Sequence, residues 1–210
     1  MKNRFNKARV LSGILLGIIG SILVVLGNWF FTIGVGFIVH LALLEYFRMA
    51  ESKGIRTATK TTLFSCQLLL IATQLSIDGI IPSQPAAAVL PVSGAAICGW
   101  LLLQPTPGKI ADIAASIFGL FYLGFLPSHW IKLRGLNGLI QIDTNNVDFT
   151  NGMTFTLIAC LCIVGSDIGS YVIGKLFGNK PLSLISPNKT IEGVFGGVGL
   201  SVFIGIISSI

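Results

Sequence analysis

Long apolar runs separated by short polar segments dominate the chain. A helix of about 20 apolar residues, rising about 1.5 Å per residue, crosses the hydrocarbon core of a bilayer. One long polar stretch, residues 128–151, interrupts the runs, and we interpret it as a connecting loop. The pattern therefore predicts an all-α fold, a polytopic membrane helix bundle with about seven transmembrane helices, at residues 10–27, 29–47, 62–81, 86–103, 110–127, 152–174 and 193–210.

The composition excludes a water-soluble globule. Hydrophobic residues make up 53% of the 210 positions and charged residues only 10%, against roughly 25% charged residues in an ordinary soluble domain. The mean hydropathy is +0.85. Lys and Arg number 14 against 8 Asp and Glu, which gives a net charge of +6. In a soluble protein this excess would suggest nucleic acid, but in a membrane protein it reports topology, so we expect no nucleic-acid partner.

The positions of the cations predict which ends of the helices face the cytoplasm. Loops on that side carry an excess of Lys and Arg. If the N-terminus is cytoplasmic, only Lys132 and Arg134 lie in an outer segment. The inner segments then hold twelve of the fourteen cations: Lys2, Arg4, Lys7, Arg9, Arg48, Lys53, Arg56, Lys60, Lys109, Lys175, Lys180 and Lys189. This orientation places the loop at residues 175–192 in the compartment that holds nucleotides.

The first apolar run is interpreted as a retained helix. Cations precede it as in a secretory signal, but no small-residue cleavage site follows and a second run begins almost at once. The nine residues before it are too few for an organelle transit peptide. We therefore expect a multi-pass protein of a bacterial plasma membrane.

One carboxylate lies within an apolar run and requires an explanation. Asp167 shares a helix face with Ser170, Tyr171, Gly174 and Gly178, at offsets of three, four, seven and eleven. Ionisable side chains inside membrane spans are costly, and they mark functional sites more often than structural ones. The alternative is that Asp167 only hydrogen-bonds a neighbouring helix.

Small residues recur at four-residue spacing around this carboxylate. The pairs Gly165/Gly169, Gly174/Gly178 and Gly193/Gly197 form small-xxx-small patterns. Such patterns let two helix backbones approach closely in a membrane. We therefore expect tight helix contact at these positions.

The segment after Asp167 has the features of an anion site. Ser186 is expected to cap a helix that begins at Pro187, which places Lys189 in the first turn. Free N–H groups, the helix dipole and an ammonium would then converge. Lys175 and Lys180 approach from the preceding segment. The alternative is a capped helix with ordinary positive-inside lysines; Asp167 favours the anion site, because a metal and phosphates together require an acid beside cations.

These residues resemble a known family, the phosphatidate cytidylyltransferases or CDP-diacylglycerol synthases. The family pattern combines an Asp-x-Gly-(Ala/Ser)-Tyr helix, a Gly-(Arg/Lys)-x-x-Gly turn and a Ser-Pro-x-Lys-Thr-x-Glu-Gly segment. Asn188 and Ile191 depart from it, since many members have a second lysine and an aromatic residue there. The matching positions are Asp167, Gly169, Tyr171, Gly174, Lys175, Gly178, Ser186, Pro187, Lys189, Thr190, Glu192 and Gly193. FYLGFLPSHWIKLRG, residues 121–135, is also similar to cyanobacterial and plastid members.

The resemblance implies a nucleotidyltransferase that moves cytidylyl from CTP to phosphatidate, giving CDP-diacylglycerol and pyrophosphate with the help of Mg²⁺. It implies a domain plan of N-terminal membrane helices at 1–127, the loop at 128–151 and the start of a catalytic membrane domain at 152–210. It assigns Asp167 and Lys189 as catalytic residues, Asp167 and Glu192 as metal ligands, and Lys175, Ser186, Asn188, Thr190 and Tyr171 as substrate-binding residues. CTP, phosphatidate and the bilayer are the expected partners, and a homo-oligomer is left open.

The last apolar run ends at Ile210 without a polar flank, and the acidic closing signature of the family does not follow it. We therefore expect that a C-terminal portion is missing and that the 210-residue chain alone shows little or no activity.

Three alternatives stay open from the sequence. CTP-dependent polyprenol or phytol kinases share related helices and the same nucleotide. A multi-span transporter would use Asp167 as an ion or proton relay. A non-catalytic fragment is the third.

Overall fold

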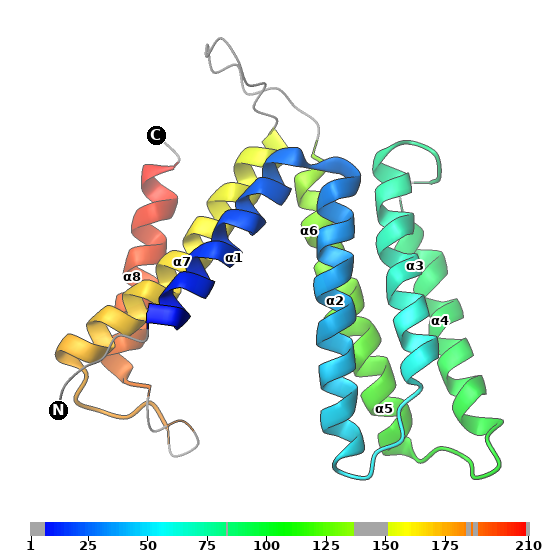
Figure 1. Ribbon diagram of the computed structural model, residues 1–210. Helices are drawn as coiled ribbons and strands as arrows, with labels where there is room; N and C mark the ends of the chain where they lie inside the picture. The colour runs from blue at the N-terminus through cyan, green and yellow to red at the C-terminus, as the bar shows by residue number, and fades with distance from the viewer. Residues whose placement is uncertain (1–6, 83, 137–150, 184–185, 187–188, 209–210) are drawn as a thin grey trace. The chain divides into compact units, whose positions relative to one another are not determined.

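The computed structural model describes residues 7–82, 84–136, 151–183, 186 and 189–208, with side chains from Leu15 onward (Figure 1). Over these residues the protein is helical and contains no β-strand, which confirms the predicted all-α class. The helices are α1 (Lys7–Leu26), α2 (Asn28–Glu51), α3 (Thr59–Ile77), α4 (Pro85–Leu102), α5 (Ile110–Phe118), the π-helical η1 (Gly119–Phe125), α6 (Leu126–Arg134), α7 (Asn151–Phe177) and α8 (Ile191–Ile207).

Among the residues whose side chains are described, four helical segments are individually long and apolar enough to cross a membrane: α2, α4, the continuous helix at Ile110–Arg134, and α7. Helix α8 is apolar but shorter. Helix α3 is less apolar because it carries Thr62, Ser65, Thr73 and Gln74 on buried positions. The protein is therefore a membrane helix bundle in which α3 turns polar groups inward.

The chain separates into two compact units, Met1–Leu139 and Ile140–Ile210, which are described individually. In the first unit, α3 packs against α2, α4, η1 and α6. The core side chains around it are Leu43, Phe47, Cys66, Leu69, Leu70, Ile97, Leu120 and Ile131. Polar contacts join the same helices: the Thr32 hydroxyl donates to Gln74 Oε1 at 2.7 Å, and Gln67 Nε2 donates to the Gly36 carbonyl at 3.0 Å. Such interhelical bonds suit a medium in which apolar contact alone gives little preference for a partner helix.

The fifth helix extends further than predicted. We expected it to end at residue 127 and a loop to begin at 128, but α5, η1 and α6 run without a break to Arg134. Pro127 lies in the first turn of α6, directly after the π-helical turn of η1, a position at which a helix tolerates proline. Residues 137–150 of the predicted loop lie outside the described residues.

Arg134, one of the two cations on the predicted outer side, has a structural role. Its Nε donates to the Val24 carbonyl at 2.6 Å, so the guanidinium caps the C-terminal end of α1. Gly27 follows with a φ of +61°, and a Cβ there would overlap the guanidinium. Arg134 therefore closes the α1–α2 turn.

Asp112 ties two loops of the first unit together. Its carboxylate is 2% exposed and accepts from the backbone N–H of Arg56 at 2.8 Å and of Lys109 at 2.8 Å. One turn later, Ser116 Oγ accepts from the Ala58 N–H at 3.0 Å. The α2–α3 and α4–α5 loops are thus joined by contacts from the start of α5.

Asp112→Asn is expected to lower the free energy of unfolding by about 1–3 kcal/mol, because the amide leaves a buried N–H without its acceptor. Thermal unfolding in detergent would measure this, with Asp78→Asn at an exposed position as the control. Equal melting temperatures for the Asp112→Asn variant and the parent would show that the carboxylate is not needed to hold the loops.

Candidate functional site

The second unit is a pair of closely packed antiparallel helices, α7 and α8 (Figure 1). A Cβ on Gly169 would lie 2.5 Å from the Gly196 carbonyl oxygen, and a Cβ on Gly193 would lie 2.8 Å from the Ser170 carbonyl oxygen. A Cβ on Gly197 would overlap Ser170 Oγ. These glycines therefore make a tight helix contact, as their spacing predicted, and the structure shows that the two partners are α7 and α8: glycine alone permits this backbone approach.

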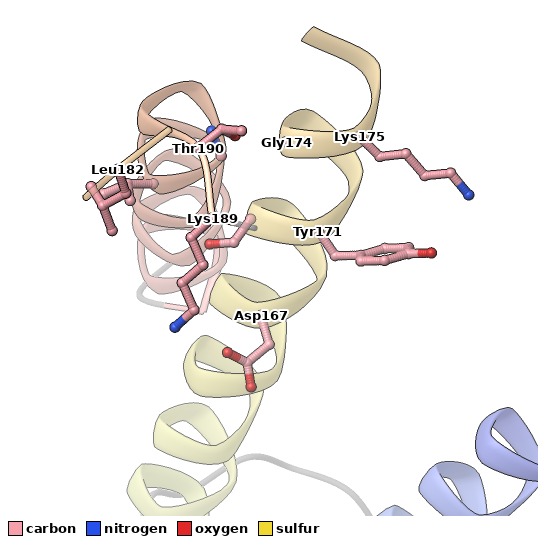
Figure 2. A pocket seen from close by; sticks show the side chains of 10 residues that line it. Asp167, Tyr171, Gly174, Lys175, Leu182, Lys189 and Thr190 are labelled. Atoms are coloured by element: carbon pink, nitrogen blue, oxygen red, sulfur yellow. The ribbon is translucent and has the colours of Figure 1, made fainter. Parts of the chain in front are cut away.

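A cavity of about 470 Å³ opens beside this contact. Its polar lining comes from Asp167, Ser170 and Tyr171 on α7 and from Lys189 and Thr190 before α8. Lys175, Gly174, Gly193, Leu182 and Val194 complete the lining. Residues that the sequence placed on one face of α7 thus meet the residues of the predicted anion segment in a single hollow (Figure 2).

The start of α8 differs from the prediction. The helix begins at Ile191 with Thr190 as its N-cap, and the Thr190 hydroxyl accepts from the Gly193 N–H at 3.2 Å. Ser186 does not cap it: the Ser186 N–H donates to the Ser183 carbonyl at 3.2 Å within a turn. Lys189 accordingly precedes the cap instead of lying in the first turn.

The reason is a pairing that local capping rules do not include. The Leu182 N–H donates to the Lys189 carbonyl at 2.7 Å, and the Ile191 N–H donates to the Lys180 carbonyl at 3.1 Å. These bonds hold residues 189–190 extended beside residues 180–182, so a helix cannot include them. Pro187 and Asn188, the latter predicted to bind substrate, lie outside the described residues.

The helix-end part of the predicted anion site is weaker than expected. The N–H groups of Ile191 and Gly193 already have partners in Lys180 and Thr190. The positive charge offered to a ligand here comes mainly from the Lys189 side chain.

Asp167 and Lys189 project toward the same side of the cavity, with the ammonium above the carboxylate in the view of Figure 2. Both side chains are exposed, and neither makes a hydrogen bond or ion pair within the described part of the chain. A cation and an anion thus lie near each other without being bonded to each other. This arrangement leaves room for a group that both can contact.

The side chains of Lys175 and Tyr171 extend away from Lys189 (Figure 2). The Lys175 ammonium is 5.6 Å from the centroid of the Tyr171 ring, within the range of a cation–π contact. The sequence-predicted Lys175 and Tyr171 therefore belong to the same cavity as Asp167 but face away from Lys189.

Glu192 has a structural contact that the sequence did not suggest. Its Oε2 accepts from the backbone N–H of Asn179 at 3.2 Å and of Lys180 at 3.4 Å. It braces the turn that leaves α7, and it does not line the cavity. Its predicted role as a metal ligand has no support in these contacts.

The donor set fits a magnesium ion only in part. The described residues contain no group of three or more His, Cys, Asp or Glu side chains placed to hold a metal. Among the described residues that line the cavity, Asp167 is the sole carboxylate. Mg²⁺ often takes only one or two protein carboxylates and completes its shell with water and substrate phosphates. Asp167 therefore fits a Mg²⁺ ion that shares its coordination with a nucleotide.

Sequence reasoning missed Leu182 and Val194, which close the cavity with apolar surface. No chemical signal distinguishes them from the many other aliphatic side chains of the chain. The dual contact of Thr190, as helix cap and cavity wall, was also missed, because the helix start was placed at Pro187.

Fold and site together define a membrane-embedded helical protein with a charged cavity built by its last two described helices. Comparison with known proteins identifies the family: residues 7–210 match the model of the cytidylyltransferase family. The chain belongs to this family, which confirms the resemblance and the nucleotidyltransferase class predicted from the sequence.

Named relatives agree with this assignment. A phosphatidate cytidylyltransferase of Synechocystis is 38% identical over 96% of the chain, which spans 71% of that protein. The chloroplastic phosphatidate cytidylyltransferase 4 of Arabidopsis thaliana is 31% identical over 97% of the chain, which spans 55% of it. The Bacillus subtilis phosphatidate cytidylyltransferase is 28% identical over 96% of the chain, which spans 70% of it. No solved structure matches the chain.

Proposed function

We propose that this protein transfers cytidylyl from CTP to phosphatidate in phospholipid biosynthesis and that the cavity between α7 and α8 binds the reacting phosphates. A phosphate oxygen of phosphatidate attacks the α-phosphorus of CTP. The new P–O bond gives CDP-diacylglycerol, the bond between the α-phosphorus and the bridging oxygen breaks, and pyrophosphate leaves with that electron pair. The observation that carries the proposal is the shared cavity of Asp167 and Lys189 (Figure 2).

The two substrates impose the location of the site. CTP is a soluble polyanion and phosphatidate is a lipid, so their phosphates can meet only near the surface of the bilayer. The cavity suits this requirement because it is formed where α7 ends and α8 begins. The positive-inside count supports a cytoplasmic position for these ends, and we extend this to a bacterial plasma membrane with a cytoplasmic N-terminus.

Phosphoryl-type transfer depends on positioning and charge neutralisation more than on acid–base chemistry. Lys189 is proposed to hold CTP phosphate oxygens, since its ammonium extends into the cavity from the segment before α8. Asp167 is proposed to hold Mg²⁺, which would neutralise phosphate charge at the α-phosphorus. Bringing together two anionic reactants needs both sources of positive charge.

The other side chains have supporting roles in the proposal. Lys175 adds positive charge and Tyr171 positions it through the ring contact. Thr190 shapes the cavity wall while it caps α8. Ser186 and Asn188 belong to the same connection and are proposed to contact phosphate oxygens.

The fate of the label from CTP tests the reaction type. We join residues 1–210 to the remaining C-terminal residues of the Synechocystis relative and supply CTP labelled with ³²P at the α position, together with phosphatidate. The proposal predicts label in the lipid fraction as CDP-diacylglycerol. Label that stays in CDP, with γ-labelled CTP marking an alcohol instead, would identify a kinase.

The 210-residue chain provides a second readout. In detergent it is expected to bind CTP, measured by displacement of a fluorescent CTP analogue, more tightly than uridine or adenine nucleotides. If the 210-residue chain binds CTP but the joined protein is inactive, the fault lies in the junction. If the chain does not bind CTP and the joined protein is also inactive, the proposal is contradicted.

A further inference from the structure

A second cavity lies in the first unit and shares no residue with the proposed catalytic site. Its volume is about 160 Å³, and it lies between the α2–α3 loop and the α4–α5 loop. Its polar and aromatic lining is Arg56, Thr57, Trp100, Gln104, Thr106 and Asp112. None of these residues has a part in the cytidylyl transfer described above.

The walls of this cavity are held by specific bonds. Asp112 binds the backbone of Arg56 and Lys109, as described above. The Gly108 N–H donates to the Leu101 carbonyl at 2.9 Å, and a Cβ on Gly108 would lie 2.9 Å from that of Leu101, so the loop folds tightly onto the end of α4. Specific hydrogen bonds and backbone contacts therefore form the walls of this cavity.

One guanidinium is fixed at this place. Arg56 Nη1 donates to the Thr106 hydroxyl, and Nη2 donates to the Thr106 carbonyl at 3.3 Å. These two bonds leave other guanidinium donors unused within the described residues, and the Arg56 side chain is exposed. A guanidinium held in this way presents a planar set of donors that matches a phosphate group.

The charge around the cavity favours an anion. The ends of these helices carry four more cations, and the carboxylate in the lining, Asp112, is buried with both oxygens bonded to backbone N–H groups. The additional cations are Arg48, Lys53, Lys60 and Lys109. Three carboxylates, Glu45, Glu51 and Asp112, stand against these four cations and Arg56, so the charge at these helix ends is net positive.

The apolar surroundings indicate that the anion belongs to a lipid. Trp100 lines the cavity and is 54% exposed, as expected for an indole at a membrane interface. Leu103 and Ile110, which bracket the same loop, are 86% and 87% exposed. A soluble phosphate would gain nothing from these side chains, whereas the acyl chains of a lipid would cover them.

We propose that this cavity binds the phosphate of one anionic phospholipid headgroup through Arg56, with Trp100 at the glycerol level and acyl chains along Leu103 and Ile110. The inference rests on the first unit alone and is independent of the proposed catalytic function. Its consequence is a defined lipid contact at the end of the helices where the positive-inside residues gather.

Quenching of Trp100 fluorescence by brominated lipids tests the proposal directly. The chain has three tryptophans, so a Trp29→Phe/Trp130→Phe background leaves Trp100 as the reporter. In phosphatidylcholine vesicles we expect brominated phosphatidylglycerol to associate about fivefold more strongly than brominated phosphatidylcholine, given about 1 kcal/mol for a favourable lipid–cation contact. Arg56→Gln is expected to remove this preference.

Three matched variants distinguish binding in this cavity from general electrostatic attraction. Thr106→Ala keeps every charge but removes one of the two bonds that hold the guanidinium, so it is expected to reduce the preference, and Thr106→Ser is expected to restore it. Lys132→Gln removes the same charge at the other end of the unit and is expected to have no effect. Inorganic phosphate at millimolar concentration is expected not to change the quenching.

Equal quenching by the two lipids in the background protein would overturn the proposal. The proposal would also be overturned if the preference for phosphatidylglycerol persisted in Arg56→Gln, or if Lys132→Gln reduced it as much as Arg56→Gln does. Either result would indicate attraction by general surface charge. Displacement of the lipid by inorganic phosphate would show a site for free anions instead.

Discussion

Replacement of Lys189 by alanine is expected to abolish cytidylyl transfer, with a loss of about 10²- to 10³-fold in kcat/KM, the size of effect seen when one stabilising group is removed from a transition state. The variant should still insert into membranes, since the Lys189 side chain is exposed and its hydrogen bonds to Leu182 and Ser186 are made by the backbone. The measurement is label transfer from CTP to lipid by the joined protein used for the function test.

Lys180→Ala is the matched control. Lys180 is an exposed lysine of the same α7–α8 connection, it does not line the cavity, and its contact to Glu192 comes from the backbone N–H. It is expected to keep nearly full activity. Similar activity losses in both variants would indicate a general effect of local charge and would contradict a specific phosphate contact by Lys189.

Replacement of Gly169 by alanine is expected to destabilise the α7–α8 pair by about 1–3 kcal/mol, the typical cost of an added methyl group in a packed contact. The methyl group would lie 2.5 Å from the Gly196 carbonyl oxygen, and a backbone atom cannot rotate away as a side chain does. The helices would have to separate, which would displace Asp167 from Lys189 and weaken CTP binding.

Gly199→Ala on α8 provides the comparison, because nothing lies within 4 Å of the Cβ position there. It adds the same methyl group to the same helix pair, and helix propensity favours alanine over glycine. Thermal unfolding and CTP binding of both variants in detergent would measure the difference. If Gly169→Ala were as stable and as able to bind CTP as Gly199→Ala, close backbone contact would not be what forms the site.

Periodicity and spacing predicted much of the structure because they report contacts between neighbouring residues. Long apolar runs are sufficient to locate membrane helices. The four-residue spacing of Gly165 and Gly169, and of Gly193 and Gly197, located the surfaces on which α7 and α8 meet. The offsets from Asp167 to Ser170, Tyr171 and Gly174 identified one wall of the cavity.

Features that depend on contacts between distant residues were not predictable in this way. Ser186 and Pro187 form a valid local start signal, but pairing of residues 180–182 with 189–191 moves the helix start to Ile191. A pairing supplied by the folded structure thus outweighs a local start signal.

Protection of lysine amines by CTP is the most direct test of the claim that Asp167 and Lys189 form one polyphosphate site. The 210-residue chain in detergent is treated with an amine-acetylating reagent, with and without CTP and Mg²⁺, and modification of each lysine is measured by mass spectrometry. The account predicts strong protection of Lys189 by CTP, little protection of Lys180, and loss of the Mg²⁺-dependent part of the protection in Asp167→Asn. Modification of Lys189 at the same rate with and without saturating CTP would contradict it.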